Sequence, residues 1–461
     1  MSEMQFSFRR MVRKYVNSSF ILVFVTLLAL IIANSSWATA YSEIWTKPVA
    51  LQFGDFNFFS HHGEPMTFMD VINDFLMAIF FFSVGLEIKR EILVGELSSL
   101  KKSLLPVIGA CGGMLIPVLF YYFTSSEGLS SKGCAIPMAT DIAFSLGILS
   151  MLGKRVPTSL KIFLAALAVA DDLGGIIVIA LFYSSEIYAT YLIYAAIVII
   201  GLIIGAYMNI RSKMFYCGLG LLVWYLFLNS GIHATIAGVI VAFCVPARPA
   251  TTSSKYIEKI REAIKQFPIT KEHSGEIHIL TNQQISLLKS VESSSDKVIS
   301  PLQDLEDSLA SIVNFIIIPI FAFANAGVNI SGFSIGSLFE GVALSVFLGL
   351  VFGKVIGIFS FAWLAIKLKI VNMPVGVDWK MLFGVSMLGG IGFTVSMFIA
   401  NLSFEGHGEE GLLLLNEAKL GILAGSVIAG AIGYTLLHKF LPKVASPDTN
   451  FADELLSVDD V

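Results

Sequence analysis

Four ionisable residues lie deep inside long apolar stretches of this chain. Asp171 and Asp172 are adjacent, and Asp141 and Lys354 lie in two other apolar stretches. A charge in the middle of a lipid bilayer is costly unless it is paired or hydrated, so each of these residues is a functional-site candidate. Carboxylates that share a site with a lysine predict an exchange of a cation for protons.

The chemistry of that exchange rests on carboxylate oxygens. A buried carboxyl group holds its proton more readily than a solvated one, and small hard cations prefer oxygen ligands. Protons and a cation can therefore compete for Asp171 and Asp172. The alternative interpretation is a buried salt bridge that only orders a helix bundle.

The spacing places these residues at similar depth. Asp171 follows Lys161 by ten residues, which at about 1.5 Å per residue is half of a roughly 30 Å hydrocarbon core. Asp141 lies eight residues into its stretch, and Lys354 lies a little past the middle of its own. Neighbouring helical residues point about 100° apart, so Asp171 and Asp172 are expected to face different partners.

The composition predicts an all-α polytopic membrane protein. Of 461 residues, 56% are hydrophobic and 14% are charged, and the mean hydropathy is +0.79. The net charge of -4, without a basic block, gives no indication of nucleic-acid binding. The four cysteines are scattered singly, which indicates neither a disulfide framework nor a metal cluster. No nucleophile–base arrangement or nucleotide-binding loop is recognisable, so we do not expect an enzyme.

Apolar stretches predict twelve transmembrane helices. They cover residues 19–36, 67–87, 103–124, 134–152, 160–184, 188–208, 213–229, 231–247, 309–328, 338–366, 381–402 and 413–438. With both termini in the cytoplasm, all but four of the 30 Lys and Arg residues fall in cytoplasmic segments. The exceptions are Lys47 and Lys132 in outer loops and Lys354 and Lys419 within spans.

The remaining segments complete the predicted organisation. Residues 1–18 form a cytoplasmic segment, 19–440 the transmembrane domain, and 441–461 an acidic cytoplasmic tail. The first span could instead be a signal peptide cleaved after 38–40; we favour a retained helix. Residues 49–59 alternate around a Gly-Asp pair and predict a β-hairpin outside. The polar 248–308 segment predicts a cytoplasmic loop with a helical part at 255–266.

Two stretches are interrupted close to these charges. GCAIPMATD at 133–141 carries a proline and small residues, and GGIGFT at 389–394 interrupts a stretch in the second half. Paired broken segments in corresponding halves indicate a transporter site at the bilayer midplane. Ordinary kinking by glycine and proline is the alternative. Partial charges at broken helix ends would be offset by Asp141 and Lys354.

On these motifs the chain resembles the NhaA family of sodium/proton antiporters, over nearly all of residues 10–440 except much of 248–300. The matching motifs are ATDIAF (139–144), AVADDLG (168–174), SGIHAT (230–235), FAFANAG (321–327) and GK (353–354). The resemblance implies twelve helices with inverted-topology repeats, two discontinuous helices that cross at the midplane, and a small periplasmic β-hairpin.

The resemblance also implies roles for the buried residues. Asp171 and Asp172 would form the ion-binding and proton-carrying pair, with Asp172 the more direct sodium ligand. Lys354 would pair with Asp171, and Thr140 and Asp141 would lie where the broken helices cross. Asp74 matches an intramembrane aspartate; a polar residue with a local partner is the alternative.

Activation by pH is implied for a charged cluster at the cytoplasmic ends of two helices. Its members would be Glu87, Lys89, Arg90, Glu91 and Glu306. By charge alone, these residues could equally form a solvated helix end. The family has a histidine after the last glutamate, where this chain has Asp307, so the pH threshold does not carry over. His233 matches a pH-linked histidine, and a structural hydrogen-bonding role is equally open.

The sequence as a whole predicts a bacterial inner-membrane Na⁺(Li⁺)/H⁺ antiporter. It would use no cofactor, exchange more than one proton per sodium by alternating access, and so be electrogenic. Residues 49–59 correspond to the family's periplasmic hairpin, so the resemblance also implies a homodimer. The rival hypotheses are a sodium-coupled symporter of an organic anion, and a membrane sensor or scaffold that uses the 248–308 loop.

Overall fold

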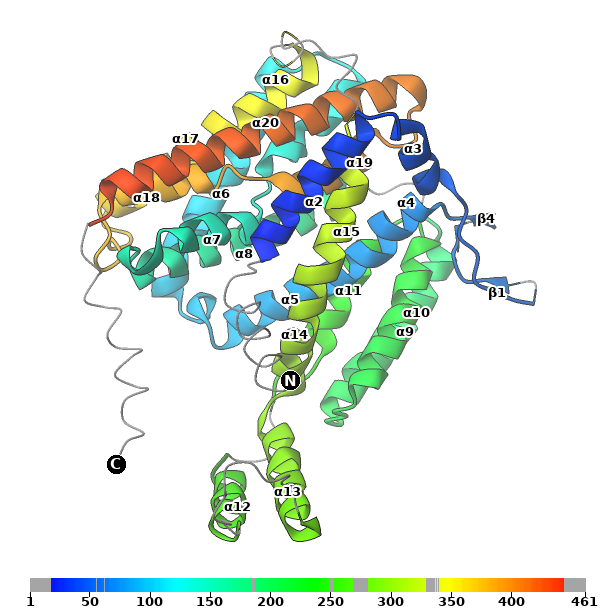
Figure 1. Cartoon of the computed structure of the whole chain (residues 1–461), viewed down its shortest axis with the longest axis vertical. Coiled ribbons are helices and arrows are strands. Elements are labelled where there is room, and N and C mark those ends of the chain that lie inside the picture. Colours follow the sequence, from blue (N-terminus) through cyan, green and yellow to red (C-terminus); the bar gives the residue numbers. More distant parts are fainter. Residues whose placement is uncertain are drawn as a thin grey trace, which may run out of the picture.

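The structure is a computed structural model that consists mainly of packed helices (Figure 1). It describes residues 18–54, 56–61, 63–183, 187–248, 253–267, 281–328, 336, 338 and 340–442. The predicted segment 1–18 and the acidic tail therefore lie almost entirely outside the described residues.

Within the described ranges, eight helical stretches are long and apolar enough to cross a membrane. They are α4–η1–α5 (Phe68–Asp70, Val71–Leu76, Met77–Leu93), α6 (Leu100–Thr124), η3–α7 (Leu129–Met138, Ile142–Met151), α8 (Thr158–Phe182), α9 (Ala189–Tyr207), α14–η5–α15 (Pro301–Ile312, Val313–Ile317, Ile318–Asn325), α16–η7–α17 (Gly341–Leu348, Gly349–Gly353, Lys354–Lys367) and α20 (Gly408–Phe440).

Two bent helix pairs raise this number to ten if each pair is one span. The first pair, α2 (Ser18–Ala33) with α3 (Ala38–Thr46), bends by 110°, and the second, α18 (Trp379–Leu388) with α19 (Phe393–Phe404), bends by 45°. The apolar helices α10 (Lys213–Leu228) and α11 (Ala234–Cys244) are shorter. Each of the twelve stretches expected from the sequence thus contains a helix, and eight to ten of them have the length of a span.

Short strands follow α3. β1 (Gln52–Phe53) pairs antiparallel with β2 (Phe56–Asn57), which confirms the predicted hairpin at 49–59. Gly54 lies in its turn with a φ of 65°, a conformation that glycine adopts without strain. A second pair, β3 (Ser60–His61) with β4 (Glu64–Pro65), was not predicted. Both pairs project from one edge of the helix bundle (Figure 1).

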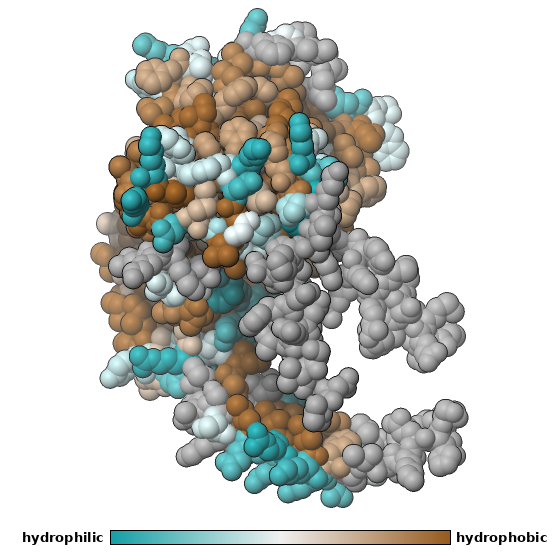
Figure 2. Space-filling model, turned by 90° about the vertical axis from the view of Figure 1, so that its left-hand side faces the viewer, coloured by the Kyte–Doolittle hydropathy of each residue, from teal (hydrophilic) through white to brown (hydrophobic). Residues whose placement is uncertain are grey.

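The 248–308 segment contains more helix than the sequence predicts. α12 (Ser253–Lys265) agrees with the expected helical part, and α13 (Asn282–Val298) is additional. The Ser-rich end of α13 has low helix propensity, which explains why the sequence did not reveal it. The two helices pack together and project from the bundle at the bottom of Figure 1. Apolar and hydrophilic surface lie side by side there in Figure 2.

Close packing of α6 on α17 positions the buried lysine. Gly112 and Gly357 touch backbone to backbone, because a Cβ on Gly357 would lie 2.1 Å from the carbonyl oxygen of Gly112. Small residues permit such close approach between membrane helices. A π-helical segment, η7, ends at Gly353 directly before Lys354. Such segments change the direction in which the following side chains point, and they are frequent at functional sites.

Candidate functional site

The two interrupted helices meet at their breaks. The Asp141 amide donates to the carbonyl of Ile391 at 2.6 Å. The hydroxyl of Ser145 donates to the carbonyl of Leu388 at 2.9 Å, and that of Ser396 donates to the carbonyl of Ile136 at 2.8 Å. Backbone groups released by each break are therefore satisfied by the other helix. This reciprocal bonding fixes a crossing of the η3–α7 and α18–α19 segments.

Asp141 caps the first turns of two half-helices at this crossing. One carboxylate oxygen accepts from the Phe144 amide at 3.1 Å in the first turn of α7. The other accepts from the amide and the hydroxyl of Thr394 at 3.1 and 2.7 Å in the first turn of α19. Helix N-termini carry partial positive charge, so one carboxylate stabilises both. The predicted offset of helix-end charge by Asp141 agrees with this arrangement.

Lys354 and Asp171 form an ion pair with both side chains 0% exposed. The lysine ammonium donates to one oxygen of Asp171. The Thr140 hydroxyl lies 2.6 Å from the same oxygen and 2.9 Å from the carbonyl of Gly389. Lys354 thus bonds to a carboxylate, whereas the sequence also suggested that it offsets helix-end charge. Thr140 links the pair to the helix crossing.

Two carboxylate oxygens beside this pair have no hydrogen-bond partner in the described part of the chain. One is the second oxygen of Asp171, and the other belongs to Asp172, which is 5% exposed. Buried polar atoms are nearly always bonded, so unpaired oxygens of this kind indicate a position for a cation or a proton. Asp171 bonds to Lys354 and Thr140, whereas this oxygen of Asp172 has no partner among the described residues.

The described residues do not form a site for a permanently bound metal ion. They contain no group of three or more His, Cys, Asp or Glu side chains that could hold a metal ion. Asp171 and Asp172 supply only two carboxylates, and Lys354 already occupies one of them.

Two other sequence candidates lie apart from these carboxylates. Asp74 is half-buried in η1, and its backbone carbonyl accepts from the Trp224 indole at 3.3 Å. The ring of His233, at the start of α11, lies edge-on to Phe398 with 6.3 Å between ring centroids. Neither side chain has a recorded bond to Asp141, Asp171 or Asp172 in the residues described.

The charged residues expected at the cytoplasmic side do assemble. Arg90 pairs with Glu91 at 3.0 Å and with Glu306 of α14 at 2.9 Å. Lys89 instead donates to the carbonyls of Phe243 and Val245 at 2.6 and 2.5 Å, which caps the end of α11.

The remaining members of that group act at longer range. Glu87 interacts electrostatically with Arg90, with Glu306 and with Asp172. Asp307 is exposed and acts electrostatically on Glu306. Glu87 therefore interacts electrostatically both with the charged cluster around Arg90 and with the buried Asp172.

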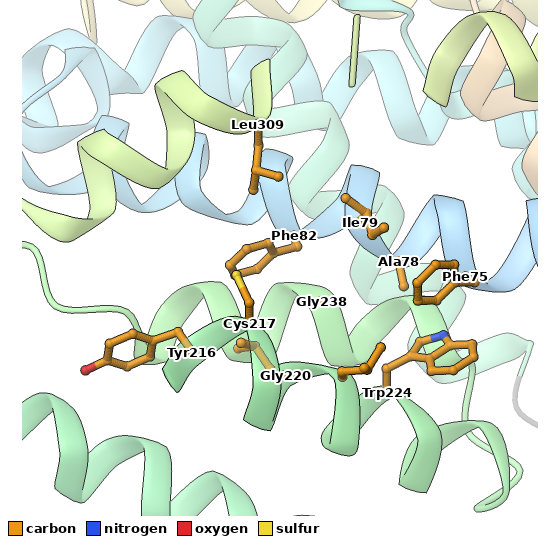
Figure 3. Close-up of a pocket in the computed structure, with 12 residues that line it drawn as sticks. Phe75, Ala78, Ile79, Phe82, Tyr216, Cys217, Gly220, Trp224, Gly238 and Leu309 are labelled. Atoms are coloured by element: carbon orange, nitrogen blue, oxygen red, sulfur yellow. The ribbon is translucent and has the colours of Figure 1, made fainter. Parts of the chain in front are cut away.

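An apolar cavity lies elsewhere, between α5, α10, α11 and α14 (Figure 3). It has a volume of about 320 Å³, and its lining includes Phe75, Phe82, Trp224 and Leu309. None of its lining residues is charged. An apolar wall offers no ligand for a small cation, so this cavity is not the ion site.

Sequence reasoning missed several polar partners. Thr394 belongs to the recognised GGIGFT interruption, yet no role was assigned to it. Asn401 donates to Asn325 at 2.5 Å, and Asn325 donates to Asn73 at 3.0 Å, forming a buried chain of amides. Asn325 lies in the FAFANAG motif, and an asparagine inside an apolar span was the available signal.

Comparison with known proteins identifies the family. The family model described as Na⁺/H⁺ antiporter 1 matches residues 9–437. A protein named Na(+)/H(+) antiporter NhaA from Phocaeicola vulgatus is 54% identical over 441 residues, covering 95% of this chain and 97% of the relative. A protein of the same name from Bacteroides thetaiotaomicron is 54% identical over 428 residues, covering 93% and 96%.

A more distant relative agrees. Na(+)/H(+) antiporter NhaA 2 from Helicobacter hepaticus is 44% identical over 419 residues, covering 90% of this chain and 91% of the relative. The apolar helices and these matches make the chain a multi-pass membrane protein. The resemblance inferred from its motifs is confirmed: the chain belongs to the NhaA family of Na⁺/H⁺ antiporters.

Proposed function

We propose that this protein is an electrogenic Na⁺(Li⁺)/H⁺ antiporter that extrudes sodium and regulates intracellular pH. The observation that carries the proposal is the buried group of Asp171, Asp172 and Lys354. It joins two unpaired carboxylate oxygens to a lysine that can release its partner. The names of the relatives support the same activity, and none of those cited above is called a symporter.

Competition between protons and sodium drives the proposed exchange. Sodium arriving from the cytoplasm binds the oxygens of Asp172 and Asp171; one proton leaves Asp172, and a second leaves the Lys354–Asp171 pair. Binding to Asp171 breaks its bond to Lys354, so the ammonium gains or loses its partner with each cycle. More than one proton is exchanged per sodium, which moves net charge across the membrane. The ions are the cargo, and no cofactor takes part.

Alternating access is assigned to the helix crossing. Asp141 and Thr140 tie the broken helices to one another and to Asp171. A movement of the crossing is therefore transmitted directly to the carboxylates. Such broken helices at the interface of inverted repeats are known for this family. We extend this to the full topology, with twelve spans, α10 and α11 among them, arranged as inverted repeats.

Orientation and assembly complete the proposal. The distribution of Lys and Arg supports an inner-membrane protein with cytoplasmic termini and a cytoplasmic α12–α13 pair. The β1–β2 hairpin projects from one edge of the bundle (Figure 1) and lies outside the cell in the predicted topology; we assign it to the contact between two copies in a homodimer. Crosslinking through a cysteine introduced at Gln52 tests that contact.

Exchange by purified protein in liposomes tests the function. A pH-sensitive dye inside the vesicles reports proton movement after addition of Na⁺, Li⁺ or K⁺. We expect Na⁺ and Li⁺ to elicit a response that K⁺ does not, and Asp172→Asn to abolish it. Asp304→Asn, which removes an exposed carboxylate paired with Lys213 at 2.7 Å, is the matched control. Sodium-dependent proton movement that survived in Asp172→Asn would refute the assignment.

A further inference from the structure

A lipid-facing crevice lies between α6, η3, α8 and the end of α19. Its volume is about 870 Å³, within the range of roughly 300–1,000 Å³ that is typical of ligand pockets. Its walls are largely apolar and include Leu115, Val118, Ile177 and Val178. Leu115 is 56% and Ile177 is 51% exposed, so the crevice opens sideways between surfaces that face the bilayer.

One end of the crevice carries a fixed cation. Lys132 Nζ lies 2.9 Å from His407 Nε2, and His407 Nδ1 lies 3.0 Å from the carbonyl of Glu405. The carbonyl can only accept, so Nδ1 carries the ring proton and Nε2 accepts from the ammonium. Lys132 is therefore held in place by a histidine whose tautomer is set by the backbone.

The polar groups beside Lys132 strengthen this end. The Tyr183 hydroxyl donates to the carbonyl of Lys132 at 2.7 Å. The Ser403 hydroxyl in turn donates to the hydroxyl oxygen of Tyr183 at 3.2 Å. These bonds join η3, α8 and α19 around the mouth of the crevice. The crevice thus has polar groups at its mouth and apolar side chains along the rest of its length.

We propose that this crevice binds one anionic phospholipid, with its phosphate at Lys132 and an acyl chain along the walls of α6 and α8. The separation of charge and apolar surface matches the two parts of such a molecule. Lys132 is the one lysine or arginine that lines the crevice, and it attracts phosphate. This lipid site lies outside the proposed ion-exchange chemistry.

A route for sodium fits the same crevice poorly. A lysine at the mouth repels a cation, and walls of Leu, Val and Ile provide no oxygen ligands. The deep end nevertheless reaches the helix that carries the aspartates: Gly174, in the lining, lies three residues after Asp171. Met114 from α6 closes over it, with its sulfur 2.1 Å from where a Cβ on Gly174 would lie. The bound acyl chain thus ends against α8 next to the ion site.

Lipid retention measured by native mass spectrometry tests the proposal. The full chain in detergent micelles is titrated with dioleoyl phosphatidylglycerol, with dioleoyl phosphatidylcholine or with inorganic phosphate. The variants are Lys132→Gln at the mouth, Leu115→Trp and Val178→Trp in the walls, and Lys47→Gln as a control. Lys47 is an exposed lysine near the hairpins and does not line the crevice. Gel filtration verifies that each variant is folded.

We expect the wild type to retain the anionic lipid about fivefold better than the zwitterionic one. This ratio corresponds to the free energy of one lysine contact with an anionic headgroup. Lys132→Gln removes that preference, at least one tryptophan variant weakens retention of both lipids, and Lys47→Gln behaves as the wild type. Inorganic phosphate alone is not retained.

Three results would overturn the proposal. Equal retention of the two lipids by the wild type would remove the role of Lys132. Full competition by inorganic phosphate would make the site one for a free anion. Loss of sodium exchange in both tryptophan variants, with lipid retention unchanged, would make the crevice part of the ion route.

Discussion

Lys354 and Asp171 pair across two helices without exposure of either side chain. An isolated charge at this depth would be far more costly than the pair, so each residue depends on the other. Thr140 also donates to the paired oxygen, which leaves the second oxygen of Asp171 for another ligand. The pair therefore keeps both charges compensated, and in the proposed exchange it opens when sodium binds Asp171.

Replacing Lys354 alone should destabilise the protein. Lys354→Met leaves the Asp171 carboxylate unpaired, and breaking a buried pair typically costs about 3–5 kcal/mol. We expect a clear fall in the apparent Tm of the detergent-solubilised protein, measured by scanning fluorimetry at pH 7. The double variant Lys354→Met with Asp171→Asn should recover most of the loss because no charge remains unpaired.

Lys367→Met on the same helix is the matched control. Lys367 lies over the Trp363 ring at 4.3 Å at the end of α17 and takes no part in the buried pair. Its replacement should change the Tm little. A double variant as unstable as Lys354→Met would show that the ion pair is not the source of the loss.

Truncation of Asp141 should weaken both broken helices together. Loss of a helix cap costs about 0.5–2 kcal/mol, and Asp141→Ala removes caps from α7 and α19. Thr394→Val removes only the hydroxyl bond and should cost less than half as much. The apparent Tm of the two variants measures the difference. Equal losses would mean that the bonds from the Phe144 and Thr394 amides to Asp141 contribute nothing.

The sequence predicted the positions of the helices well because apolar runs of span length carry a strong signal. Every expected stretch contains a helix, and the hairpin at 49–59 is present. Length alone gives eight to ten spans among the described residues, since α10 and α11 are short. The pairing of β3 with β4 was missed because two-residue strands have almost no periodicity.

Partner choice in the site could be predicted only in part. The depth of Asp171 and Lys354 follows from their place in the chain, and the family resemblance implied their pairing. Asp141 caps two helices that are far apart in the sequence: Asp141 and Thr394 are separated by 253 residues. The double cap therefore depends on how these two helices are placed relative to each other. Local propensity contains no information on that contact. The π-helical segment before Lys354 likewise depends on tertiary packing.

The Arg90–Glu306 pair should influence the pH dependence of exchange more than stability. Partly exposed ion pairs contribute up to about 1 kcal/mol, and the side chains here are 37% and 17% exposed. Glu306→Gln removes a charge that interacts with Glu87, which in turn acts on Asp172. We therefore expect a shifted pH profile of sodium-dependent proton movement in liposomes, with a nearly unchanged Tm.

Asp304→Asn on the same helix distinguishes a specific effect from a general loss of charge. Asp304 pairs with Lys213 and has the same formal charge as Glu306. Its replacement should leave the pH profile in place. Identical shifts in both variants would assign the effect to overall surface charge.

Glu405 should make stability depend on pH. This residue follows α19, outside the spanning helices. The residue as a whole is exposed, but desolvation of its carboxyl group raises its pKa to about 7, the charge of Asp70 acts in the same direction, and Lys419 opposes them. The folded protein therefore holds this proton more tightly than the unfolded chain. Stability from the protonated form is fully present below the ordinary value of 4.5 and is lost as the pH rises through 7.

Glu405→Gln removes that loss because the amide stays neutral. The variant should match the wild type in apparent Tm at pH 4.5 and exceed it at pH 8, with most of the difference arising between pH 5 and 7. Glu410→Gln, which removes an exposed carboxylate in the first turn of α20, should not show this pH-dependent gain. Scanning fluorimetry across this pH range provides the measurement. A gain of equal size at pH 4.5 and pH 8 would contradict the argument, because only an ionising carboxyl group produces a difference that grows with pH.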